Sequence, residues 1–361
     1  MNKLILVPLG VLATATAFGQ GFFPYDSLVV ARVNGTTSAA NSVDLVGFNF
    51  DGTSNSKVFG LGSGFTLSGS ATSEGQMNAS LNYLALGGYS ATVGTASVAS
   101  TTTARRVAVY DNFANGGLGG VNYVDLQAGI YSANNIRSAY TTDGTTVLTG
   151  GTATSPNGGW RTTTAGTSTE LGTTQNVRVI KEVGGTTYGS TGSASGNAGI
   201  GIYSVTPGAE TLVQLTGGTG TGTASPYDFE FYNENSTDYT LVADDRSTAN
   251  GGGLQVYKNG SLFRTIALPS TTSALRSIAV RSWNNNGVQE TTVFGIANAN
   301  KLVGFTFDNG TLETTSNSFA ELATADTGTV FRSIEIVPEP ASLAIVGIGL
   351  AGLASRRRRK N

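Results

Sequence analysis

The side chains that could do chemistry in this sequence are of few kinds. The 361 residues include no histidine and no cysteine. That excludes nucleophiles activated by histidine, histidine-bound zinc and iron–sulfur centres. Among the remaining reactive types, the densest group is Asp244-Asp245-Arg246, at the end of a predicted strand. Three charges there could bind Ca²⁺ or another ligand, or could act as acid and base.

A structural role for the same three residues is the alternative. An aspartate and an arginine can close a turn by pairing, and Gly251-Gly252-Gly253 follows shortly afterwards. The sequence has no Asp-x-Asp-x-Asp-Gly loop, which an EF-hand-like calcium site would require. We therefore assign no catalytic residue, no metal centre and no cofactor. Asp244, Asp245 and Arg246 are kept as a candidate ligand or calcium site.

Other groups of polar or aromatic residues have plainer interpretations. Arg105 and Arg106 begin a strand and are expected to be a surface pair. Trp160 and Trp283 could stack on sugar rings, although aromatic residues more often pack between blades in a fold of the kind considered below. A looser acidic group is interpreted as a solvated face; it consists of Asp228, Glu230, Glu234 and Asp238.

All these residues must be positioned by β-strands, because the body contains no convincing amphipathic helix. Short runs of β-forming residues alternate with Gly, Asn, Asp and Ser, which favour turns. Strands are predicted at residues 28–33, 43–50, 106–110, 176–181, 199–205, 239–243, 253–257, 277–281, 291–297 and 301–307.

A weak internal repeat organises the strands. Residues 43–51 resemble residues 300–308, and an apolar-Arg-Ser sequence recurs around Arg137, Arg276 and Arg332. Strand starts of this type, or their equivalents, fall near residues 77, 137, 178, 229, 276 and 332, with spacings of 41 to 60 residues. A four-stranded propeller blade takes about 40 to 50 residues.

The two ends of the body complete the pattern. The last strand, at 330–337, has no partner after it, and the first strands, from Leu28, have the character of the second and third strands of a blade. Pairing them would close a ring and remove exposed sheet edges. We predict an all-β propeller of six blades, with seven as the alternative count. A β-solenoid and a stack of β-sandwiches are the other folds considered.

Both termini have the character of targeting segments. Residues 1–19 combine Lys3, an apolar run at 4–11 and small residues up to Gly19, which predicts a cleaved signal peptide. At the other end, residues 341–355 are apolar and uncharged. As a helix they would span about 22 Å, somewhat less than the ~30 Å hydrocarbon core.

A basic stop follows this apolar segment; it consists of Arg356, Arg357, Arg358, Arg359 and Lys360. The pattern predicts a short transmembrane helix with a cytoplasmic C-terminus and an external body. With Val337-Pro338-Glu339-Pro340 before it, the segment 337–361 resembles the PEP-CTERM sorting domain of Gram-negative bacteria. The resemblance implies recognition by exosortase, transient anchoring in the inner membrane, and then release or transfer to the cell surface, often in organisms that make extracellular polysaccharide.

The body, residues 20–336, resembles secreted proteins that carry the same tail. The resemblance rests on the residues 73–76, 135–138 and 242–253, and it implies no activity. Losing Lys3 and the five tail cations would leave 15 basic residues against 23 acids, a net charge of about −8 if every acid stays. Such a body does not favour nucleic acid, which requires clustered Lys and Arg.

We therefore expect an exported, non-catalytic protein of the cell surface or biofilm matrix. Its expected partners are signal peptidase and exosortase during processing, the inner membrane transiently, and extracellular polysaccharide. The alternative is a propeller enzyme that acts on polysaccharide with carboxylates and tyrosine. That enzyme would need a central channel lined by Asp, Glu, Tyr and Arg from different blades. A repeat spacer without a closed body is the third option.

Overall fold

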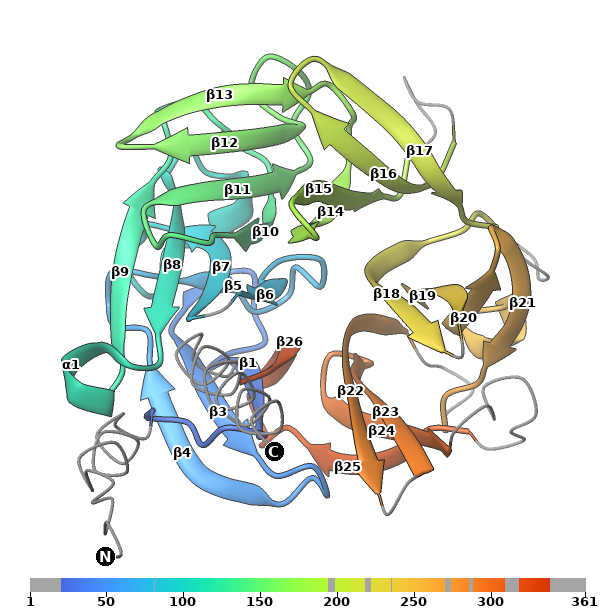
Figure 1. Ribbon diagram of the computed structural model, residues 1–361. Helices are drawn as coiled ribbons and strands as arrows, with labels where there is room; N and C mark the ends of the chain where they lie inside the picture. The colour runs from blue at the N-terminus through green and yellow to red at the C-terminus, as the bar shows by residue number, and fades with distance from the viewer. Residues whose placement is uncertain are drawn as a thin grey trace, which may run out of the picture.

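The body is a ring of six four-stranded antiparallel sheets whose inner strands surround a common axis (Figure 1), and we call the region along this axis the channel. The computed structural model describes residues 21–80, 82–193, 199–217, 222–234, 236–269, 274–285, 288–308 and 318–337. Six blades are thus confirmed, and the solenoid, the stacked sandwiches, the open spacer and a seventh blade are wrong. The predicted signal peptide, Pro338 to Pro340, the apolar segment and the basic stop lie outside the described residues.

Five of the blades are continuous in sequence, and their strands run outward from the channel in chain order. Their bounds are, blade by blade, β6 (Met77–Ala79), β7 (Tyr83–Tyr89), β8 (Arg105–Asp111) and β9 (Gly120–Asp125); β10 (Ile136–Tyr140), β11 (Thr146–Gly151), β12 (Trp160–Thr164) and β13 (Thr167–Gly172); β14 (Val177–Val183), β15 (Thr186–Thr191), β16 (Gly201–Thr206) and β17 (Ala209–Leu215); β18 (Pro226–Glu234), β19 (Thr237–Asp244), β20 (Gly253–Lys258) and β21 (Ser261–Ile266); β22 (Leu275–Asn285), β23 (Val288–Ala297), β24 (Lys301–Asp308) and β25 (Ala320–Thr324).

The sixth blade is built from both ends of the body. Its order is β26 (Val330–Ile336), β1 (Leu28–Val33), β3 (Val43–Phe48) and β4 (Ser54–Gly60). Leu28 pairs with Ile336, and the Val337 N–H donates to the Ser27 carbonyl at 2.9 Å. The predicted closure is therefore confirmed, and every strand of the ring lies between residues 28 and 336. A body without the two terminal segments keeps its complete set of strands.

Several short elements lie outside the six sheets, among them the 3-10 helices η2 (Val98–Ser100) and η3 (Thr248–Asn250). The short strands β2 (Ala40–Asn41) and β5 (Leu67–Ser68) pair with each other, and α1 (Ala114–Gly117) is one short turn between β8 and β9. Among the described residues, no helix is long and apolar enough to cross a membrane.

Polar bonds between inner strands hold neighbouring blades in register. The Ser138 hydroxyl accepts the Ile180 N–H at 2.9 Å, and the Ser277 hydroxyl accepts the Ile334 N–H at 3.1 Å. Positions are counted here from the arginine near the start of each inner strand. The serine is the first residue after its arginine, and the residue whose N–H it accepts is the second residue after the arginine of the next inner strand. This constant offset means that the inner strands run in the same direction and begin at the same mouth of the channel.

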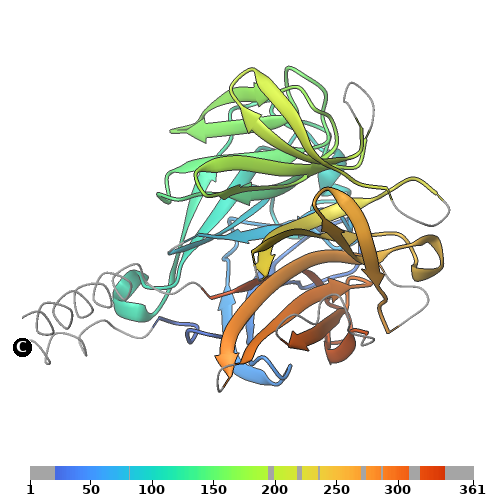
Figure 2. The ribbon, with the colours of Figure 1, turned by 45° about the vertical axis from the view of Figure 1, so that its right-hand side comes forward.

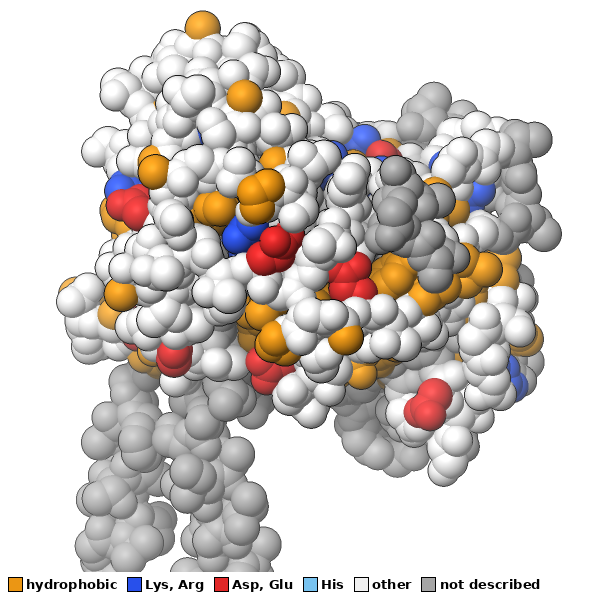
Figure 3. Space-filling view, turned by 90° about the horizontal axis from the view of Figure 1, so that it is seen from above, with side chains coloured by type: hydrophobic (Ala, Val, Ile, Leu, Met, Phe, Trp, Pro, Cys, Tyr) orange, Lys and Arg blue, Asp and Glu red, His pale blue; other side chains and the backbone are white. Residues whose placement is uncertain are grey.

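Apolar side chains fill the space between the radial sheets, whose arrangement Figure 2 shows in a turned view of the ribbon. Trp160 is fully buried and packs against Val177, Ile180 and Tyr203. Its ring lies so close to Gly189 that a Cβ there would come within 1.8 Å of it. Trp160 thus packs between blades and is not available to stack on a sugar. On the side of the ring shown in Figure 3, charged side chains are few and scattered.

Candidate functional site: the central channel

The channel is lined by side chains that repeat at matching positions of the inner strands. The second or third residue of four inner strands is an arginine, and Tyr227 takes that position on β18. We call these five side chains the arginine mouth; it consists of Arg137, Arg178, Tyr227, Arg276 and Arg332. In the remaining blade, the parallel bridge between Gln76 and Ser138 puts Gly75 at this level. The apolar-Arg-Ser repeat of the sequence therefore marks one end of the channel.

The arginines flank the ring of Tyr227, which is 4% exposed. The guanidinium carbon of Arg178 lies 4.1 Å from the centre of this ring, and that of Arg276 lies 5.8 Å from it. Arg178 also donates to the Ser225 hydroxyl at 2.7 Å. Stacking on one aromatic ring brings two like charges from non-adjacent blades toward the same place.

The protein neutralises the arginine mouth only in part. Asp245 pairs with Arg276 at 2.8 Å. Glu74 is fully buried and accepts hydrogen bonds from the Tyr89 hydroxyl and the Asn135 amide. Burial raises the pKa of Glu74, and these hydrogen bonds counteract the shift. Four guanidinium groups therefore share at most two carboxylates.

The crowding of positive charge is visible in the pKa values of the arginines. Burial, and next the charge of Arg178, lower the pKa of Arg137 to about 10. Burial likewise lowers the pKa of Arg332 to about 10; Glu74 raises it, and Arg276 lowers it further. Both groups stay protonated at neutral pH, so the mouth is a partly buried region of net positive charge.

Further along the same strands, Lys181 and three carboxylates form a second set, which we call the carboxylate level. Lys181 Nζ lies 2.8 Å from Asp228 Oδ1 and 2.7 Å from Glu230 Oε1. Glu335 of β26 is 8% exposed and Tyr140 is 7% exposed. These side chains come from four different blades.

Burial dominates the electrostatics of the carboxylate level. It lowers the pKa of Lys181, but the charges of Asp228 and Glu230 outweigh it, and the pKa is raised. Burial raises the pKa of Glu335 well above its usual value; Lys181 counteracts this in part, whereas Asp228 and Glu230 add to it. The pKa of Glu230 is also raised by burial, against the effect of Lys181. The single lysine therefore does not fully compensate the three carboxylates, of which Asp228 and Glu335 are buried and Glu230 is partly exposed.

This arrangement corrects two expectations. Asp228 and Glu230 do not form a solvated face: Asp228 is 1% exposed, and its second oxygen accepts the Ile278 N–H at 3.0 Å. Arg105 is not part of a surface pair, because it is 1% exposed and donates to backbone carbonyls, among them Ala99 and Thr101, both at 2.9 Å. The sequence signal for the carboxylate level would have been the third position after the arginine mouth residue of each inner strand. Lys181 lies at this position on β14, and Glu230 and Glu335 lie there on β18 and β26.

Asp244, Asp245 and Arg246 do not point to a common centre. Asp244 is fully buried, and its carboxylate holds Arg246 at 2.9 and 3.1 Å and the Ser225 N–H at 3.2 Å. Asp245 turns instead toward Arg276. Within the described ranges, no group of three or more acidic side chains is arranged to hold a metal ion. A ligand or calcium site at these three residues stays a prediction.

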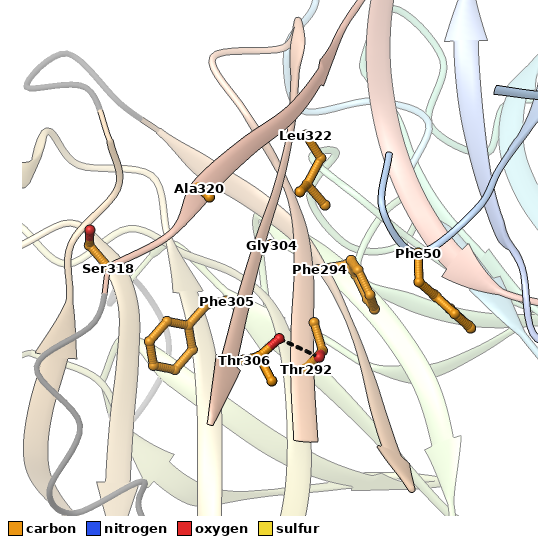
Figure 4. A pocket seen from close by; sticks show the side chains of 9 residues that line it. All are labelled: Phe50, Thr292, Phe294, Gly304, Phe305, Thr306, Ser318, Ala320 and Leu322. Carbon is orange, nitrogen blue, oxygen red and sulfur yellow. Dashed lines mark hydrogen bonds between the residues drawn. The ribbon is translucent and has the colours of Figure 1, made fainter. Parts of the chain in front are cut away.

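A second concavity lies on the outside of the ring, where the blade of β22–β25 meets the segment after β3 (Figure 4). This groove has a volume of about 570 Å³. Phe50 and Phe294 stack with ring centres 5.3 Å apart, and the Thr292 and Thr306 hydroxyls share a hydrogen bond of 2.7 Å. Its other lining residues are Gly304, Phe305, Ser318, Ala320 and Leu322. None of the described residues that line the groove is charged, in contrast to those of the channel.

The comparisons with known proteins bear on the tail and on the fold. Residues 337–359 match the PEP-CTERM protein-sorting motif. The chain carries a PEP-CTERM sorting signal. This signal implies processing by exosortase, export and anchoring at the cell surface. Its first residue, Val337, is buried against the ring directly after β26.

No curated protein is significantly similar to the chain in sequence. Among solved structures, a triple arginine-to-alanine mutant of AofleA from Arthrobotrys oligospora aligns over 89% of this chain and 92% of its own, with 11% identity and a TM-score of 0.46. The conclusion that this chain has six blades rests on the pairing of its own strands and not on this similarity.

Proposed function

We propose that this protein is an exported, non-catalytic binding propeller of the cell surface or extracellular matrix, delivered through its PEP-CTERM signal. The observation that carries the proposal is the position of the signal. It begins at Val337, one residue after the strand that closes the ring. A cut beyond Val337 removes the targeting segment and leaves all six sheets intact, so the exported product is the propeller itself.

The ligand we propose for this propeller is extracellular polysaccharide. Several charged side chains of the propeller lie in the channel, where inner strands of different blades place them at two levels, the arginine mouth and the carboxylate level. Clustered arginines with incomplete counter-charge favour recognition of an acidic partner over chemistry on it. Such binding would let the released ring associate with a matrix outside the cell.

A polysaccharide-cleaving enzyme is the alternative, and one observation favours it. The channel is lined by carboxylates, Tyr140 and arginines from different blades, as such an enzyme would need. The state of the carboxylates argues the other way: Asp228 is bound to Lys181 and to a backbone amide, and Glu335 is buried. A catalytic pair must reach the glycosidic bond from both sides. We therefore rank binding first.

The sorting part of the proposal is tested by replacing Pro338, Glu339 and Pro340 with alanine in the full chain. Cell fractionation should then find the variant retained in the inner membrane, whereas the native chain reaches the surface or the medium. A variant with Pro207→Ala, in the exposed turn between β16 and β17, is the control for loss of a proline. Release of the triple variant at the native rate would contradict sorting through this motif.

The binding part is tested with the body, residues 20–337, on an array of bacterial polysaccharides with and without Ca²⁺. Binding of at least one polysaccharide is expected, and a calcium dependence lost in Asp245→Asn would support the site at Asp244 to Arg246. Reducing-end release from the same polysaccharides distinguishes the enzyme. Cleavage abolished by Glu230→Gln or Glu335→Gln would replace the binding proposal, and a folded body that binds nothing would overturn it.

A further inference from the structure

We propose that the arginine mouth is an oxyanion-binding site, and that the oxyanion it takes is a carboxylate or sulfate group of an acidic polysaccharide. The choice of a polysaccharide as the source rests on the function proposed above. The oxyanion site itself rests only on the side chains of the mouth: their unused donors, their charge and their placement.

The first argument concerns donors. Arg332 is 2% exposed, and its Nη2 donates to the Gly69 carbonyl at 2.7 Å and to the Ser68 carbonyl at 3.0 Å. Its Nε and Nη1 have no acceptor in the part of the protein that the structure describes. The buried Nε atoms of Arg137, Arg178 and Arg276 also find none there. A buried N–H without an acceptor is costly, and an anion supplies several acceptors at once.

The second argument concerns charge. Asp245 pairs with Arg276 and also attracts Arg178, and burial raises the pKa values of both Asp245 and Glu74, the second acid near the mouth among the described residues. Arg105 also lies near Glu74 and interacts electrostatically with the same carboxylate. Partly buried like charges repel each other strongly because water screens them poorly. A bound anion would remove this repulsion, and a guanidinium fork fits the planar or tetrahedral face of a carboxylate or sulfate.

The third argument concerns placement. The arginines come from four inner strands, and two of them, Arg178 and Arg276, flank a single aromatic ring, so these charges are held by rigid elements at one mouth. Arg276 keeps 15% of its side chain exposed, and Arg137 and Arg178 are partly exposed, which leaves the mouth open to solvent. Tyr227 itself is 4% exposed, so the groups that a ligand would meet at the mouth are the guanidinium groups and not this ring. This combination fits an anionic group on a sugar ring.

The test is calorimetric titration of the body, residues 20–337, with four probes. They are sodium sulfate, trigalacturonic acid, neutral maltotriose and a short single-stranded oligodeoxynucleotide. We expect sulfate and trigalacturonate to compete for one site per chain, and maltotriose not to bind. A folded body that binds neither sulfate nor trigalacturonate would overturn the proposal.

Variants locate the site. Arg137→Gln should weaken trigalacturonate binding about tenfold or more, because charge-assisted hydrogen bonds are lost, and Arg137→Gln with Arg178→Gln should abolish it. Arg264→Gln removes a cation from the outer strand β21 and is the matched control. Equal weakening by Arg264→Gln and Arg137→Gln would show general charge attraction instead of a site.

A second readout separates binding from folding. Without ligand, Arg137→Gln should melt at the native temperature or above it, because the variant relieves repulsion from Arg178. Thermal stabilisation by sulfate should be lost at the same time. If Arg137→Gln unfolds the body instead, Arg137→Lys tests the same point, since it keeps the charge but loses the fork; native affinity in Arg137→Lys would contradict recognition by guanidinium.

The probes also separate this inference from the proposed function. Binding of sulfate but not trigalacturonate supports the oxyanion site and overturns its assignment to a carboxylated polysaccharide. Tighter binding of the oligodeoxynucleotide than of trigalacturonate would overturn that assignment in favour of nucleic acid. Failure of the sorting variant to change localisation would refute the delivery route and leave the oxyanion site standing.

Discussion

Replacing Lys181 with methionine should strongly destabilise the body at neutral pH. Lys181 is 7% exposed and lies within 2.8 Å of both Asp228 and Glu230, whose side chains are 1% and 26% exposed. Methionine fills a similar volume but leaves the carboxylates without their cation. Removing one partner of a buried ion pair costs about 3–5 kcal/mol. With a guanidinium chloride slope of about 5 kcal/mol per molar, the unfolding midpoint would fall by about 0.6–1 M.

The loss should depend on pH in a defined direction. The pKa values of Glu230 and Glu335 are raised in the folded state, so the folded state binds more protons than the unfolded state at pH values above the ordinary glutamate pKa. The free energy of unfolding therefore rises as these groups take up protons on acidification. Without Lys181 the pKa values of both rise further. The difference in the free energy of unfolding between the native body and Lys181→Met should thus shrink as the pH is lowered from 8 to 5.

Guanidinium chloride unfolding at pH 5, 6, 7 and 8 measures both effects. Lys301→Met is the matched control, because the pair of Lys301 and Glu321 is exposed and such pairs contribute little. Adding Asp228→Asn to Lys181→Met should recover part of the loss, since it removes an uncompensated charge. The reasoning would be refuted if Lys181→Met were as harmless as Lys301→Met, or if its deficit grew on acidification.

Three further predictions concern the ring. Gly189→Ala should cost at least about 2–3 kcal/mol by overpacking, because the new Cβ would meet Trp160 at 1.8 Å; a wild-type melting temperature would contradict that close packing. Glu335→Gln should stabilise the body by an amount that grows from pH 5 to pH 8, since the native carboxyl has a raised pKa and is costly to ionise; urea unfolding at both pH values measures this, and a pH-independent effect would refute it. A chain that stops at Thr329 lacks β26 and should be poorly folded by circular dichroism and prone to associate, whereas one that stops at Val337 should be monomeric by size-exclusion chromatography; equal behaviour of the two chains would contradict closure by this strand.

The sequence predicts the blades because their inner strands keep a readable signature. An apolar residue, an arginine and a serine recur near the start of β10, β22 and β26. Ser138 and Ser277 accept an N–H from the next blade, and Ser333 donates to the Gly75 carbonyl. The closing strand was also predictable, since residues 330–337 had no other partner. Individual strand ends were less accurate: β22 runs from Leu275 to Asn285, beyond the predicted 277–281.

The carboxylate level could not be predicted in the same way. Lys181, Asp228 and Glu335 are about 50 and 100 residues apart, and nothing local shows that they meet. Their contact depends on the register of three blades around the channel. Seen alone, Asp228 and Glu230 resemble any exposed acidic run. Asp244 does close a turn with Arg246 and the Ser225 N–H, which was one of the two local interpretations, whereas a ligand or calcium site at these residues remains a prediction.

The parallel course of the inner strands gives the ring two unlike faces. The strands begin at the arginine mouth, and β26 ends at the opposite face, where Leu28 and Val337 also lie. Under the proposed function, a chain anchored by the segment after Val337 would turn the arginine mouth away from its anchor. A polymer arriving from outside would then meet the arginine mouth while the tail is processed at the opposite face. Capture of a ligand and cutting of the tail would not obstruct each other, and a ring that has bound a matrix chain could be released together with it.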